Sequence, residues 1–105
     1  MHQFVHWKSA IQGAVTTGEV QEVMDQYAAS IAAGDKVTLP APCKTVLRDV
    51  DIALGAETLI REEARYQGDP ATASLLHEIA QTFVAAANRI EFLDSQSYPR
   101  DAASR

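Results

Sequence analysis

The sequence predicts an all-α protein, a small antiparallel bundle of about four helices in one domain. Between a few Gly and Pro positions, apolar residues recur at steps of three and four, which is the spacing of a helix with one buried face. No stretch shows the sustained alternation of a half-buried strand. With 105 residues, of which 47% are hydrophobic, the chain has room for one domain with a modest core.

Two shorter helices are expected first. A helix is predicted over residues 3–15, because Phe4, Trp7 and the apolar residues after them lie three or four positions apart. Thr16 and Glu19 then have the spacing of a capping box, in which a hydroxyl accepts from a helical amide and a carboxylate reaches back. A second helix therefore begins there and is expected to end at Gly34.

A linker is expected over residues 34–42, because its two prolines remove amide donors and favour extended backbone. A short edge strand over residues 36–39 is the alternative to a purely extended linker. In either case the segment connects the second helix to the part of the chain with the longest apolar pattern.

A helical hairpin follows the linker. One long helix is predicted over residues 42–67 with Gly68 as its terminator, and the next begins directly at Asp69–Pro70. Such a short connection makes two helices antiparallel neighbours, and it is expected to place Leu54 opposite Phe83. The domain is expected to span residues 1–94, followed by a flexible C-terminal tail over residues 95–105.

The long helix carries more apolar surface than one neighbour can cover, because a second apolar arc lies opposite the arc that faces the hairpin partner. Either the N-terminal helices stack along this second arc or a second subunit covers it, and the width of the arc favours a homodimer. The aromatic residues of the first helix either pack in the core or serve as anchors. The predicted partner or dimer interface comprises Phe4, Trp7, Ile52, Ala56, Leu59, Ile60 and Tyr66.

The sequence predicts no catalytic residue, no cofactor site and no metal site. Cys43 lies in register with apolar positions, which is typical of a small buried hydrophobe. His2 and His6 share a helix face but have no further ligand nearby, and His77 is expected on a solvated face. Glu62–Glu63 are expected to form surface ion pairs with neighbouring arginines.

The composition of the chain limits its expected cellular location and the kinds of partner that it can bind. Lys and Arg number 9 against 14 Asp and Glu, and the resulting net charge of −5 disfavours nucleic acid as a partner. No window is apolar enough to span a membrane. A single cysteine excludes an intrachain disulfide, and the N-terminus lacks the pattern of a secretory signal, so a cytoplasmic location is expected.

These observations favour a small acidic regulatory protein that acts by protein–protein binding, for example an anti-activator that sequesters a transcriptional regulator or another larger partner. The alternatives are a structural subunit that only dimerises and a secretion-type chaperone. A DNA-binding regulator fits less well, because the basic residues are scattered along the chain. An enzyme also fits less well, because no catalytic motif occurs.

Overall fold

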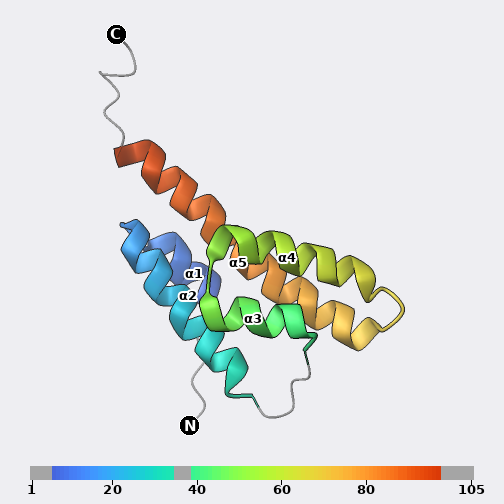
Figure 1. The fold of residues 1–105 in the computed structure, drawn as a ribbon. Helices are drawn as coiled ribbons and strands as arrows, with labels where there is room; N and C mark the ends of the chain where they lie inside the picture. Colours follow the sequence, from blue (N-terminus) through green and yellow to red (C-terminus); the bar gives the residue numbers. More distant parts are fainter. Residues whose placement is uncertain (1–5, 35–38, 98–105) are drawn as a thin grey trace.

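The computed structural model describes residues 6–34 and 39–97, and within these ranges the chain forms five α-helices and no strand. The all-helical prediction is therefore confirmed for this part of the chain. His2, Phe4 and residues 36–38 of the alternative strand lie outside the described residues. The helices are α1 (Trp7–Gly13), α2 (Thr17–Ala32), α3 (Ala41–Asp49), α4 (Ile52–Arg65) and α5 (Pro70–Ser97) (Figure 1).

Two predicted helix starts are confirmed by side-chain caps. The Glu19 amide donates to Thr16 Oγ1 at 3.1 Å, while the Val15 amide donates to the Glu19 carboxylate at 2.8 Å, so the carboxylate reaches one residue beyond the usual capping box. At the start of α5, Asp69 accepts from the Thr72 amide at 3.4 Å and from its hydroxyl at 2.8 Å. Both caps use amides that have no partner within the helix.

The single long helix predicted over residues 42–67 is wrong, because the chain breaks between α3 and α4. Val50 adopts the left-handed conformation, with φ 50° and ψ 49°, which a β-branched residue rarely does. Burial of its side chain and a 3.0 Å hydrogen bond from Gln21 Nε2 to its carbonyl hold it there. Asp51 then caps α4 by accepting from the Leu54 amide at 3.2 Å. As a result α3 lies alongside α2 and α4.

The predicted hairpin is present as α4 and α5, which make the most extensive contact in the structure. Its register differs from the prediction by one residue, since Gly55 and not Leu54 faces the fully buried Phe83. A Cβ atom on Gly55 would lie 2.9 Å from Phe83 Cε2 and 2.8 Å from Val46 Cγ1. Only a residue without a side chain fits where α3, α4 and α5 meet, which is why the larger Leu54 points outward.

The N-terminal helices complete the core against α5. The Trp7 and Tyr27 rings pack edge to face with centroids 5.4 Å apart, and Tyr27 meets Phe83 in the same manner at 6.4 Å. Arg89 on α5 donates from Nε and Nη2 to the Ala14 carbonyl at 3.1 and 2.8 Å. These two bonds join the turn between α1 and α2 to α5.

The last helix is the longest, with 28 residues, and its C-terminal end projects past the other helices in Figure 1. It continues to Ser97, so residues 95–97 of the expected tail are helical, and residues 98–105 lie outside the described part. None of the helices described here combines the length and the hydropathy needed to cross a lipid bilayer.

Candidate functional site

Three of the predicted interface residues are buried in the core. Ile52, Ala56 and Leu59 lie on the inward face of α4, and Leu59 has no exposed surface at all. The prediction assumed one continuous helix with two opposite apolar arcs. Because the helix breaks after Asp49, α3 and α4 each have their own inward face, and the second arc contacts the core. These three side chains are therefore not accessible to a partner in this structure.

The other predicted interface residues are not gathered on one surface. Trp7 and Tyr66 are half-buried and pack against the core, whereas Ile60 on α4 is 49% exposed. Phe4 lies outside the described residues. Of the predicted set, Ile60 is thus the one described side chain that is largely open to solvent.

Leu54 is exposed to 57% and differs from the other large exposed apolar side chains of the described residues in its surroundings. Leu54 lines a groove between α3 and α4 of about 350 Å³, whereas Val15, Ile60 and Phe92 do not line this groove. We call this the α3–α4 groove. It is lined by Pro42, Thr45, Val46 and Asp49 from α3 and by Asp51, Leu54, Gly55 and Thr58 from the start of α4.

The α3–α4 groove has an apolar centre and a charged end. Val46 is buried, Leu54 is exposed, and Gly55 between them has no side chain, so the two helices lie close together while a large apolar side chain stays open to solvent. Asp49 and Asp51 lie where α3 turns into α4. This arrangement can accept an apolar side chain of a ligand beside a carboxylate.

An ion pair fixes the charge state at that end. Arg48 Nε lies 2.9 Å from Asp49 Oδ1, and its hydrogen bond, with a smaller effect of its charge, lowers the pKa of Asp49. The same contact raises the pKa of Arg48. Both side chains are largely exposed, so the pair is in contact with water and Asp49 stays ionised at neutral pH.

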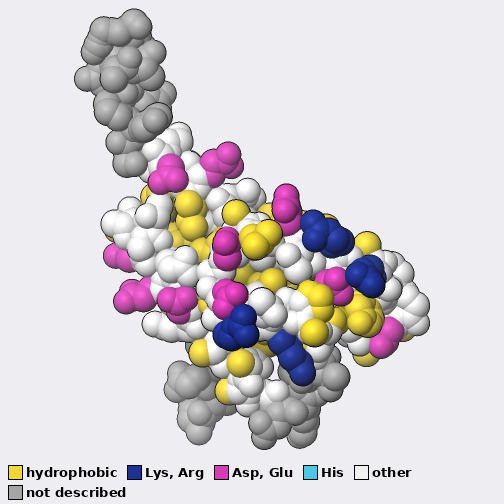
Figure 2. All heavy atoms as spheres, in the orientation of Figure 1, with side chains coloured by type: hydrophobic (Ala, Val, Ile, Leu, Met, Phe, Trp, Pro, Cys, Tyr) yellow, Lys and Arg dark blue, Asp and Glu magenta, His cyan; other side chains and the backbone are white. Residues whose placement is uncertain are grey.

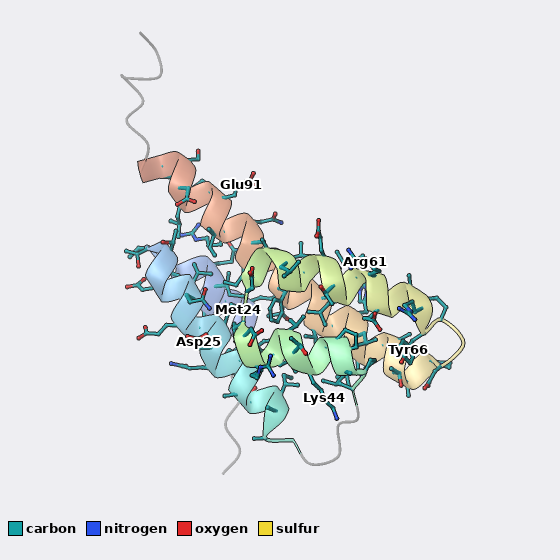
Figure 3. All side chains as sticks on the ribbon, viewed as in Figure 1. Met24, Asp25, Lys44, Arg61, Tyr66 and Glu91 are labelled. Atoms are coloured by element: carbon teal, nitrogen blue, oxygen red, sulfur yellow. The ribbon has the colours of Figure 1, made fainter. Side chains whose placement is uncertain are left out.

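Charge is unevenly distributed around the groove. Figure 2 shows Lys and Arg side chains over α3 and α4 with acidic side chains between them, and further acidic side chains over α2 and the outer end of α5. Lys44 on α3, Arg61 on α4 and Glu91 on α5 mark these regions in Figure 3. The surface around the α3–α4 groove thus carries charges of both signs, with Asp49 and Asp51 in its lining and the basic side chains of α3 and α4 beside it.

A larger hollow of about 520 Å³ lies between the end of α2 and α3, with Ile31, Leu39, Lys44 and Arg48 among its lining residues. The undescribed residues 35–38 connect its lining residues in the chain. We therefore build the candidate site on the α3–α4 groove, all of whose lining residues are described.

The residues considered for chemistry are divided between core and surface. Cys43 is buried, as predicted, and burial with a smaller effect of the Glu62 charge raises the pKa of its thiol to about 11. Glu62 is only 6% exposed, so its predicted place on the surface is wrong, and its carboxylate lies 3.6 Å from Arg65 Nη1. Glu63 contacts His77 Nδ1 at 3.0 Å. Among the described residues no cluster of three or more His, Cys, Asp or Glu is placed to hold a metal ion.

Sequence reasoning missed Leu54 as a surface residue, because a continuous helix puts it in phase with Val50 on the inner arc. Asp51 carried the signal that a break occurs there, since Asp is a preferred N-cap residue and it precedes a new run of apolar residues. If a new helix is assumed to begin after Asp51, Leu54 no longer belongs to the inner apolar face of the preceding helix.

Comparison with known proteins identifies no family for this chain. No protein-family model, no curated protein and no solved structure matches the chain. The α3–α4 groove and the charges around it are therefore the observations from which a function is proposed.

Proposed function

We propose that the protein is a small regulatory protein that binds a segment of a larger protein in the α3–α4 groove, in the manner of an anti-activator. Leu54 is the observation that carries this proposal, because it is a large apolar side chain, 57% exposed, in a groove on a folded surface. We place the protein in the cytoplasm, where a chain with one buried free cysteine needs no disulfide.

The composition of the groove supports a protein ligand. Protein interfaces combine an apolar centre with a polar rim, and here Leu54 and Val46 lie between carboxylates at one end and arginines on α4 beyond the other. Burying a fully exposed leucine side chain contributes about 1.5–3 kcal/mol, and covering the exposed part of Leu54 contributes a share of this free energy. A few such central contacts supply most of the binding energy in a typical interface.

The test compares two aspartate substitutions on the same helix. Leu54→Asp places a charge in the groove, whereas Ile60→Asp places the same charge at a similarly exposed position that does not line it. We expect both variants to fold. In quantitative affinity capture from the native cell, the unchanged protein and Ile60→Asp should capture similar amounts of a partner. Leu54→Asp should capture at least tenfold less of it.

The control in this experiment is the helix content and unfolding midpoint of each variant, which should match those of the unchanged protein. Recovery of the same proteins in the same amounts with all three baits would show that the groove binds no partner. A partner lost equally with both substitutions would place the binding surface elsewhere on α4.

We also propose that the protein forms a homodimer, through a surface other than the predicted arc. Val15 and Phe92 are both exposed, and Arg89 links them, since it donates to the carbonyl of Ala14 beside Val15 and lies 5.0 Å from the Phe92 ring. Phe92 is 49% exposed on the projecting part of α5, where a second copy has access to it.

A further inference from the structure

The two ends of the α3–α4 groove differ in charge, and this difference gives information about the ligand. At the junction of the helices, Asp49 and Asp51 carry two negative charges against the one positive charge of Arg48. Asp51 uses Oδ1 to cap α4, while Oδ2 takes no part in that bond. This end of the groove is therefore negative overall and favours a basic group of a ligand.

Beyond the opposite end, outside the groove lining, Arg61 and Arg65 carry two positive charges against the one negative charge of the buried Glu62. Because α4 has 14 residues and α3 has 9, α4 extends past the start of α3 by several residues. Steps of four, three and four residues from Leu54 reach Thr58, Arg61 and Arg65, so all of them lie along one face of α4. Arg61 is exposed and Arg65 is 70% exposed, with its nearest carboxylate, that of Glu62, 3.6 Å away. Figure 2 shows basic side chains over this part of α4.

The size and the walls of the groove favour a short helix as ligand. Its shorter wall, α3, is about 13 Å long, which corresponds to about two helical turns. Both walls are helices whose backbone groups are already bonded, so the described part of the groove offers no edge to which a strand could be added. A helix satisfies its own backbone and needs only side-chain contacts, with apolar residues at i and i+4 over Leu54 and Val46.

We propose, on the basis of the function proposed above, that the α3–α4 groove binds a two-turn amphipathic helix of its partner in one direction only, with acidic residues before and basic residues after the apolar pair. The acidic residues lie at Arg61 and Arg65, and the basic residues lie at Asp49 and Asp51. An acidic N-terminus and a basic C-terminus also stabilise the ligand helix through its dipole. The ligand helix therefore runs antiparallel to α4.

The test uses synthetic peptides as probes and the full chain as receptor. Two peptides of about 14 residues have the same composition and the same central leucines at i and i+4, and differ only in charge order. One carries Glu before and Lys after the leucines, and the other carries them reversed. At low salt we expect the Glu-first peptide to bind at least tenfold more tightly by fluorescence anisotropy, and salt should reduce this ratio because exposed charges are screened.

A receptor with both ends reversed supplies the second arm. In the double variant Asp49→Lys with Arg61→Glu, the preference should change to the Lys-first peptide, while the folded helix content stays the same. Equal affinity of the unchanged protein for both peptides, or preference for the Lys-first peptide, would overturn the directional proposal.

The variant Leu54→Asp distinguishes this failure from failure of the proposed function. Loss of binding of both peptides in Leu54→Asp, without a preference in the unchanged protein, would keep the groove as a binding site and refute the direction. Binding that is unaffected by Leu54→Asp, or absent for both peptides, would count against the groove itself and thus against both proposals.

Discussion

Gly55 allows α3, α4 and α5 to pack closely together, because it has only a hydrogen atom in place of a side chain. The position is buried within α4, where glycine is less favourable than alanine by about 1 kcal/mol. Glycine is nevertheless needed here, because Val46 from α3 and Phe83 from α5 occupy the space that a side chain would fill. Because Gly55 faces the core, Leu54, the residue before it, lies on the outer side of α4 and lines the groove.

We expect Gly55→Ala to destabilise the protein. Overpacking a core costs about 1–3 kcal/mol, and the gain in helix propensity offsets about 1 kcal/mol of it, so the net loss in the free energy of unfolding should reach up to about 2 kcal/mol. Urea unfolding followed by circular dichroism measures this loss. Gly68→Ala is the matched control, because a Cβ there meets nothing within 4 Å and its φ is not positive. Equal stability of both variants would contradict the packing argument.

At the scale of elements, the break between α3 and α4 decides what the sequence could predict. The caps at Thr16 and Asp69 were predictable because their bonds are local, between residues three or four apart. The left-handed conformation of Val50 was not, because it depends on burial of the side chain and on a bond from Gln21, which lies 29 residues away in the chain. Local preference alone favours continuing a helix through a residue such as Val50.

Asp51→Ala is expected to lower the free energy of unfolding by about 1 kcal/mol, because it removes the acceptor for the Leu54 amide at the start of α4. Asp51→Asn keeps an acceptor at this position and should restore most of the loss. Thermal or urea unfolding of the two variants beside the unchanged protein measures the difference. If alanine and asparagine proved equally stabilising, the side-chain cap would not be what fixes the start of α4.

At the scale of the whole molecule, the all-helical class and the hairpin followed from apolar periodicity, which needs no knowledge of distant contacts. The candidate site did not follow. A surface groove depends on how α3 lies against α4, and the error of one residue in the hairpin register was enough to exchange Leu54 with Gly55. The apolar excess assigned to a partner was instead covered by the chain itself, since Leu59 is fully buried.

The proposed homodimer gives the last prediction, and it concerns the distribution of charge over the molecule. Phe92 projects on the part of α5 where Glu91 and other acidic side chains gather (Figures 2 and 3). Two copies that cover Phe92 bury apolar surface but also bring like charges together. Sedimentation equilibrium at tens of micromolar protein should therefore report twice the 11.4 kDa monomer, with tighter association as salt rises.

Phe92→Ser should return the mass to that of the monomer, because the aromatic ring is the largest exposed apolar side chain at the proposed contact and a central aromatic residue contributes strongly to binding. Leu54→Ser is the matched control, since it removes a similarly exposed apolar side chain on α4 and should leave the dimer intact. Association that weakens with salt, or that depends on Leu54 and not on Phe92, would instead indicate that the charged surface around the α3–α4 groove makes the contact between copies. A monomer mass for the unchanged protein at every salt concentration would refute self-association, and Phe92 would then remain an exposed ring on α5.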